Sequence, residues 1–152
     1  MPRLTLHFLL TILMCLYSSL SRADVRVLDF SKQSNVELSG TWHYYPKQLT
    51  VDTSTLAAIS VDLPNSFEVM LGEVNHHGIF RQTFDIPHAA IGQPLALFIP
   101  YQYGAYRLYI NDKLMLKVGQ VGAVDQHRTQ MAPRLLIFTL DKAEFDIRLD
   151  FS

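Results

Sequence analysis

Cysteine is almost missing from this chain of 152 residues, because Cys15 is the only one. It lies in an apolar stretch near the N-terminus, so a chain without that stretch contains no thiol. Disulfides and thiol catalysis are therefore excluded for residues 24–152. A thiol-free chain is compatible with an oxidising compartment such as the bacterial periplasm.

The N-terminal apolar stretch is too short for a membrane anchor. Residues 8–16 are about half of the roughly 20 apolar residues that span a bilayer. Arg3 precedes the stretch, and Ser21-Arg22-Ala23 follows with small residues where signal peptidase cleaves. We therefore expect residues 1–23 to be a signal peptide cleaved after Ala23, and residues 24–152 to form one periplasmic domain.

Clusters of lysine and arginine are absent as well. The chain has 13 Lys and Arg, of which Arg3 and Arg22 lie in the expected signal peptide, against 14 Asp and Glu. The remaining chain is mildly acidic and has no basic patch to neutralise phosphates. Nucleic acid is therefore not expected as a partner.

The motifs of common catalytic and metal sites are also missing. No Gly-x-Ser-x-Gly elbow occurs, and the adjacent His76 and His77 diverge in an extended segment, which disfavours one shared metal ion. The carboxyls of Asp85, Asp146 and Asp150 alternate with apolar residues, which we interpret as solvated strand positions. We expect no catalytic residues, no metal and no cofactor.

What the sequence does contain is apolar side chains at every second position, the pattern of half-buried strands. The pattern predicts strands over residues 36–45, 59–63, 79–86, 95–99, 106–110, 114–118, 135–140 and 145–151. The segment Asn111-Asp112-Lys113 predicts a tight hairpin, since Asn and Asp tolerate positive φ. Residues 135–140 are apolar on both parities, which predicts a central strand. The fold class expected is all-β, an antiparallel β-sandwich of the jelly-roll type.

The alternation continues to Phe151 and stops at Ser152 without a turn or a polar tail. An apolar strand that ends a chain leaves an exposed edge. We therefore expect the sequence to be truncated at its C-terminus.

Aromatic residues provide the best candidates for ligand binding. Tyr101, Tyr103 and the nearby Arg107 offer rings and a guanidinium that suit a sugar or another polar ligand. The alternative is that these tyrosines only border a strand. Tyr106 is expected to pack inward with the apolar side chains of its strand.

The strand positions of two further side chains indicate their roles. Arg81 is a weaker ligand candidate, and the alternative is a surface ion pair with Asp85 or Glu68. Trp42 lies at apolar parity and is predicted to belong to the core.

Three stretches resemble a known receptor family. Leu38–Tyr45 resembles the L-x-G-x-W-x-x-Y opening of galactose-binding-like jelly rolls, and Gly78–Phe84 resembles the G-x-(Y/F)-R strand that follows it. Ala105–Leu114 with Gly119–Gly122 resembles the A-Y-R-L-Y-(V/I)-N-G-K-L … G-x-V-G segment of seven-transmembrane receptors with diverse intracellular signalling modules (7TMR-DISM). Asp112 stands where that family has glycine.

The resemblance covers residues 27–151 and implies a periplasmic sensory domain that binds a carbohydrate-like small molecule. In that family such a domain is joined to transmembrane helices and a cytoplasmic diguanylate cyclase or histidine kinase. The alternative function is a protein-interaction or accessory β-sandwich without a small-molecule ligand, docked on a membrane receptor or signalling partner.

Overall fold

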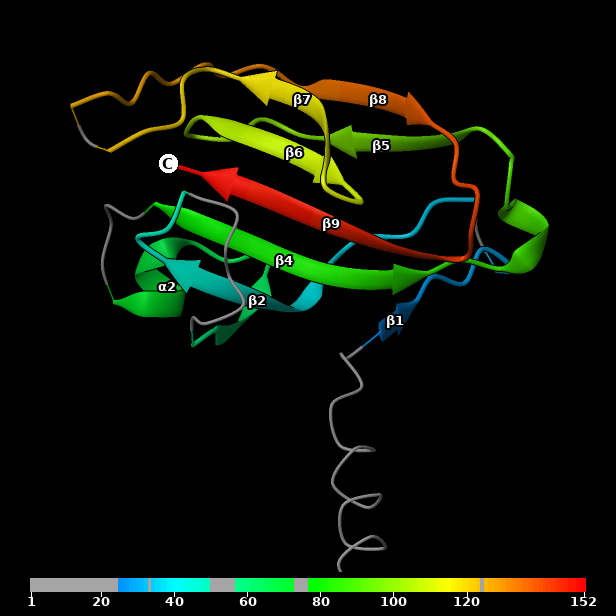
Figure 1. Cartoon of the computed structure of the whole chain (residues 1–152). Coiled ribbons are helices and arrows are strands. Elements are labelled where there is room, and N and C mark those ends of the chain that lie inside the picture. The colour runs from blue at the N-terminus through cyan, green and yellow to red at the C-terminus, as the bar shows by residue number, and fades with distance from the viewer. Residues whose placement is uncertain (1–24, 33, 50–56, 73–76, 124) are drawn as a thin grey trace, which may run out of the picture.

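The computed structural model describes residues 25–32, 34–49, 57–72, 77–123 and 125–152, which form two packed β-sheets (Figure 1). The described strands are β1 (Val25–Val27), β2 (Gly40–Pro46), β3 (Ile59–Leu63), β4 (Gly78–Asp85), β5 (Leu95–Ile99), β6 (Tyr106–Ile110), β7 (Lys113–Val118), β8 (Arg134–Phe138) and β9 (Glu144–Phe151). Two short helical elements are α2 (Phe67–Leu71) and the 3₁₀ turn η1 (His88–Ala90). The expected all-β sandwich is confirmed.

The larger sheet has the strand order β3-β2-β4-β9-β6-β7, and all of these neighbours are antiparallel. The short β1 runs parallel to the second half of β4, beyond the part that pairs with β2. Of the described strands, the smaller sheet contains β5 and β8, and it lies over one face of the larger sheet (Figure 1).

The centre of the larger sheet is the pairing of β4 with β9, which runs from Gly78 opposite Phe151 to Asp85 opposite Glu144. Even-numbered β4 residues and odd-numbered β9 residues face the smaller sheet, so Phe80, Phe84 and Ile147 are buried. The opposite parity faces outward. Apart from the buried Gln82, the inner face of the central pair is therefore apolar, and the outer face carries the charged side chains.

The core lies between the two sheets and is rich in aromatic rings. Trp42 and Tyr44 of β2 are buried, and the Trp42 ring meets the Phe84 ring edge to face at 5.6 Å between centroids. The Trp42 indole N–H also donates to the Leu38 carbonyl at 3.1 Å. The predictions that Trp42 and Tyr106 point into the core are confirmed.

The hairpin between β6 and β7 is confirmed at the expected residues. Asn111 and Asp112 both have positive φ, 49° and 60°, which is the backbone of a type I′ turn. Asn111 also receives a 3.0 Å hydrogen bond from the Asp146 N–H through its side-chain oxygen, and its own N–H donates to the Asp146 carbonyl. The turn therefore fixes the start of β9.

The structure corrects the prediction of a central strand over residues 135–140. The strand ends at Phe138 and pairs only with β5 among the described residues. Leu135 and Ile137 point outward and are exposed, whereas the residues that alternate with them face the core. The strand is therefore apolar on both of its faces, although one face is open. The prediction was wrong because side-chain polarity does not show how many strands flank a given strand.

The remaining differences concern short or irregular segments. The predicted strand over residues 36–45 begins only at Gly40, and the three residues of β1 were missed. The helix α2 was also missed, because one turn is too short for a periodic signal. It begins after Ser66, whose hydroxyl accepts a hydrogen bond from the Val69 N–H, and ends at Gly72 with φ of 72°.

The predicted signal peptide, residues 1–23, lies outside the described residues, as does His76. Within the part of the chain that the structure describes, no helix has the length and apolarity to cross a membrane.

We expect Trp42→Ala to lower the free energy of unfolding by about 3–5 kcal/mol, because it removes a buried ring and leaves a cavity. Trp42→Phe keeps a ring in the core but loses the indole hydrogen bond, and should cost less. Urea unfolding measures both values, with the exposed Lys113→Ala as the control. A Trp42→Ala protein as stable as its parent would contradict this account of the core.

Candidate functional site

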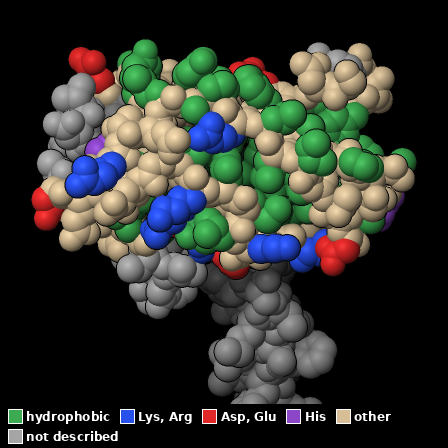
Figure 2. Space-filling view, turned by 90° about the horizontal axis from the view of Figure 1, so that it is seen from above, with side chains coloured by type: hydrophobic (Ala, Val, Ile, Leu, Met, Phe, Trp, Pro, Cys, Tyr) green, Lys and Arg blue, Asp and Glu red, His purple; other side chains and the backbone are tan. Residues whose placement is uncertain are grey.

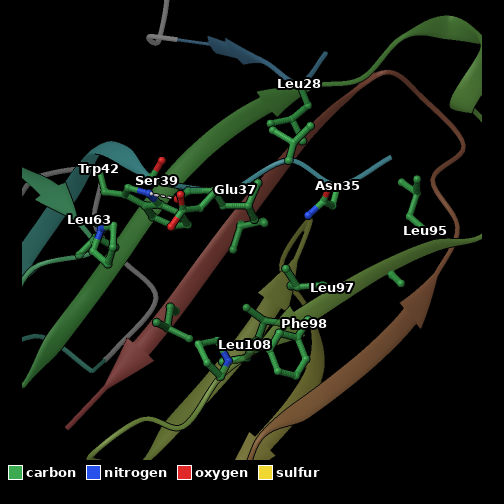
Figure 3. Close-up of a pocket in the computed structure, with 18 of the residues that line it drawn as sticks. Leu28, Asn35, Glu37, Ser39, Trp42, Leu63, Leu95, Leu97, Phe98 and Leu108 are labelled. Atoms are coloured by element: carbon green, nitrogen blue, oxygen red, sulfur yellow. Dashed lines mark hydrogen bonds between the residues drawn. The ribbon is translucent and has the colours of Figure 1, made fainter. Parts of the chain in front are cut away.

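A groove of about 1760 Å³ opens between the sheets, and we call it the core groove (Figure 3). Its floor is the inward face of the larger sheet, where the lining residues are Trp42, Phe80, Tyr106, Leu108, Phe145, Ile147, Leu149 and Phe151. Its walls include β5, the segment 34–39, and residues of the 63–66 turn and α2. Typical small-molecule pockets have volumes of about 300–1,000 Å³, so the core groove is larger than such a ligand needs.

One wall of the core groove is the edge of β5 rather than its face. All five residues from Leu95 to Ile99 line the groove, although successive side chains of a strand point to opposite faces. Both parities border the groove only if the backbone edge lies along it. From β8, on the other side of β5, only Phe138 lines the groove.

The segment 34–39 lies on another side of the groove. Val36 and Leu38 are partly buried against the core, while Asn35 and Glu37 are exposed. Figure 3 shows Asn35 and Glu37 on this segment, apart from Leu97 and Phe98 on β5. The sequence indicated this alternation but not that the segment would remain outside the sheets.

Charge on the groove has a single sign. Asp29, Glu37 and Glu68 are exposed lining residues, and no lysine, arginine or histidine occurs among the described residues that line it. The pKa of Asp29 is lowered by hydrogen bonds from Ser31, whose N–H donates to the carboxylate at 2.8 Å. The groove is therefore apolar inside and acidic at its rim.

The smaller sheet also has an apolar outer face. Ala96, Phe98, Leu135 and Ile137 point away from the core, and we call them the outer apolar patch. The three large side chains are 62%, 64% and 68% exposed. Figure 2, seen from above the smaller sheet, shows many hydrophobic side chains on this side of the molecule. Soluble monomers rarely leave such side chains clustered in the open without a binding role.

Two predicted ligand residues lie on the loop between β5 and β6. Tyr101 is 67% and Tyr103 is 86% exposed, and Tyr103 lines the core groove. The loop is held against the end of β9, since Ala105 and Ser152 exchange two backbone hydrogen bonds of 2.8 and 2.9 Å. Gly104 fits there because a Cβ at this position would meet the Phe151 ring at 2.5 Å.

The other two predicted ligand residues lie elsewhere. Arg107 and Arg81 project from the outer face of the larger sheet, whereas Tyr103 borders the inner groove. Arg107 pairs with Asp150 at 3.0 Å and donates to the Leu49 carbonyl at 3.2 Å. The structure thus does not bring Tyr101 and Tyr103 together with the two arginines, and it assigns both arginines to ion pairs.

The interpretation of the aspartates as solvated was wrong for two of them. Asp150 is almost fully buried on the outer face, with its side chain 3% exposed, and Asp146 is largely buried. Asp146 pairs with Arg81 at 2.9 Å, so the alternative pairing of Arg81 with Asp85 or Glu68 was also wrong. Alternation placed these carboxyls on the outer face correctly but does not reveal that the outer face is covered.

Arg148 is the central member of this polar cluster and was missed from the sequence. Its side chain is 2% exposed, and its Nε lies 3.3 Å from Asp150. Its Nη1 donates to Asp112 at 3.1 Å, and its guanidinium stacks on the Tyr109 ring at 3.8 Å from the centroid. The only available sequence signal was its position between Asp146 and Asp150 at the same parity.

Burial changes the acid–base properties of this cluster. The pKa values of Asp146 and Asp150 are raised, because burial disfavours their charged forms more than the neighbouring arginines stabilise them. The hydrogen bond from Arg81 to Asp146 raises the pKa of Arg81, although burial opposes this. The arginine therefore stays charged, and burial dominates the titration of its partner.

A serine and a histidine also meet near the end of β9. His127 Nδ1 lies 2.9 Å from the Ser152 hydroxyl, and Nε2 lies 2.8 Å from the Thr129 hydroxyl. The Ser152 oxygen also accepts a hydrogen bond from the Gly122 N–H at 3.3 Å. The second ring nitrogen thus contacts a hydroxyl rather than a carboxylate, so the arrangement is not an acid–base–nucleophile triad. The contact between His127 and Ser152 instead attaches the loop of residues 119–130 to the end of β9. Among the described residues, no three His, Cys, Asp or Glu side chains are grouped as metal ligands.

No protein-family model and no curated protein matches this chain. Similar solved structures include a GH2 β-galacturonidase from Eisenbergiella tayi bound to galacturonate, with a TM-score of 0.53 and 11% identity over 75% of this chain. A β-glucuronidase from Faecalibacterium prausnitzii matches 77% of this chain with a TM-score of 0.57 and 14% identity.

These matches cover only 18% and 20% of the two glycosidase chains, so this chain corresponds to about a fifth of each. At this identity they establish a shared β-sandwich fold. These structures do not bear on the finer resemblance to seven-transmembrane receptors, which stays a prediction.

We expect the stability contributed by Asp146 to depend on pH. Because its pKa is raised above the ordinary 3.8, the folded protein binds this proton more tightly than the unfolded chain does. The resulting stabilisation is complete when the pH is below the ordinary pKa of the unfolded chain. It is lost as the pH rises through the raised pKa of the folded protein. Relative to Asp146→Asn, the parent should therefore gain unfolding free energy between pH 7 and pH 4 in urea titrations.

Asp29→Asn provides the opposite control, because the pKa of Asp29 is lowered and its stabilisation is lost on acidification. If the difference in unfolding free energy between the parent and Asp146→Asn were constant with pH, burial would not raise the pKa of the Asp146 carboxyl.

Proposed function

We propose that this chain is an exported, non-catalytic domain that binds carbohydrate in the periplasm and senses it for a membrane signalling receptor. The observation that carries the proposal is a pair of exposed tyrosines on one loop, of which Tyr103 lines the core groove, on a sandwich shared with parts of two sugar-acting enzymes.

The loop provides suitable chemistry for a sugar. The rings of Tyr101 and Tyr103 present open apolar faces on which the C–H side of a sugar ring stacks, and their hydroxyls remain free for hydrogen bonds. The Gln102 side chain lies between them in sequence and lines the groove together with Asn35. Of the four predicted ligand residues, this proposal therefore keeps only the two tyrosines. Arg81 and Arg107 form ion pairs on the opposite face of the larger sheet.

The acidic rim narrows the class of sugar. Both solved structures act on uronic acid glycosides according to their names, and one is bound to galacturonate. In this chain Asp29, Glu37 and Glu68 line the groove, and none of the described lining residues is basic. A uronate would meet like charge there, so we expect neutral sugars to bind better than uronic acids.

The proposals of export and of a role in signalling are supported by the sequence. Residues 1–23 have the charge, apolar stretch and cleavage site of a signal peptide, and the chain that follows has no cysteine. The sensory role rests on the resemblance of Ala105–Leu114 to the receptor family, and the hairpin within that segment forms as its sequence predicts.

A second candidate function is a protein-interaction or accessory domain with no small-molecule ligand. The outer apolar patch and the free edge of β5 favour it, since both are features of surfaces that bind other proteins.

Calorimetric titration against a panel of neutral and uronic oligosaccharides tests the sugar proposal. We expect at least one neutral glycan to release heat, and Tyr103→Ala to weaken its binding about tenfold through loss of the stacking ring. Tyr103→Phe, which keeps the ring, should retain most of the affinity. Met131→Ala is the matched control, since Met131 is exposed but does not line the groove. No heat from any glycan would refute this proposal and favour the second function.

Mass spectrometry of the protein recovered from a bacterial periplasmic fraction tests export. The mature chain should begin at Asp24, because cleavage is expected after Ala23. Ala23→Arg should block processing, since signal peptidase requires a small residue there. Full-length protein retained in the cytoplasm of the parent strain would contradict export.

A further inference from the structure

Two segments that border the core groove have backbone groups without a backbone partner in the described part of the chain. The strand β5 pairs with β8 along one edge only, and its other edge lies along the groove. Within the described residues, the segment 34–39 makes no hydrogen bond between its backbone and that of another residue. Backbone N–H and C=O groups that line an apolar space require partners, and a strand edge is a template for another strand.

The floor of the groove favours an extended occupant. Side chains from four strands present a continuous apolar surface there, including Phe80, Ile147 and Leu149. A strand lying above this floor directs every second side chain toward it and the others toward solvent. An occupant with apolar side chains at alternate positions therefore buries them while its backbone pairs with β5.

The charges at the rim favour a basic occupant. Asp29, Glu37 and Glu68 lie on the lining, and no described lining residue is cationic. Complementary charge at an interface selects partners and accelerates their encounter. Lysine or arginine near the ends of the occupant would meet this rim.

We propose that the core groove binds an extended segment of another polypeptide as an added β-strand, paired to the free edge of β5, with alternating apolar side chains and basic residues at its ends. This is the strand-addition mode of peptide recognition, in which backbone hydrogen bonds provide affinity and alternate side chains provide specificity. The strand site shares the core groove and its acidic rim with the sugar site, but it depends on the edge of β5 and not on the rings of Tyr101 and Tyr103. Loss of sugar binding in Tyr103→Ala and loss of peptide binding therefore test the two proposals independently.

A nine-residue peptide with alternating valine and threonine and lysine at both ends is the probe. We expect it to bind the purified protein, and hydrogen exchange to show the amides of β5 becoming about tenfold slower to exchange in its presence. The matched control peptide has proline in place of two central residues, which removes the N–H donors while keeping the charge. It should neither bind nor protect these amides.

Charge reversal tests the rim without altering the core. In Glu37→Lys/Glu68→Lys both changed residues are exposed, so the fold should be kept, as circular dichroism would show. We expect the lysine-ended peptide to bind this variant about fivefold more weakly at low salt, and a glutamate-ended peptide to bind it more tightly. Equal affinities of both peptides for parent and variant would refute the role assigned to the rim.

Three results would overturn the proposal. Equal binding of the proline peptide would show adsorption on apolar surface rather than strand pairing. Binding without slower exchange of the β5 amides would place the peptide elsewhere, for example on the outer apolar patch. If those amides became protected with rising protein concentration in the absence of peptide, and sedimentation showed dimers, the occupant would be a second copy of this chain.

Discussion

The eight-residue pairing of β4 with β9 is the constraint on which the rest of the structure depends. It aligns an apolar row, including Phe80, Phe84 and Ile147, on one side of the sheet and the Arg81, Asp146 and Arg148 row on the other. A slip of one residue in β9 would turn Arg148 into the aromatic core and Ile147 outward. The buried ion pairs thus fix the register of the strand that forms the floor of the groove, and the Asn111 turn holds its first residues in place.

Most of the fold follows from local sequence. Period-two alternation located β3, β5 and β6 to the residue and placed the others, except the missed β1, within a few residues, because one buried face imposes that pattern wherever a strand is half exposed. The β6–β7 hairpin followed from Asn111 and Asp112, whose side chains tolerate positive φ. Alternation along a strand does not show which strands lie beside it in a sheet. For this reason β8 was expected at the centre of a sheet and is found in a two-stranded one.

The candidate site was predictable only in part, since it depends on which segments meet in space. Tyr103 was chosen because its ring suits a sugar and binding residues concentrate on loops, and the structure places it at the border of the groove. Arg107 was chosen for its nearness in sequence to Tyr103, yet strand alternation turns it to the other face, where Asp150 holds it. The groove itself has no sequence signature, because its lining comes from the loops and strands of both sheets together.

The exposed side of the smaller sheet has a consequence for the handling of this protein. The segment 135–140 has six consecutive residues without charge or proline, and two of its apolar side chains face solvent on a strand with one described neighbour. Short segments of this kind stack readily into intermolecular cross-β fibrils. Solubility at high concentration therefore requires that this side be shielded, and a lysine in place of Ile137 would act as a gatekeeper against fibrillation without entering the interior.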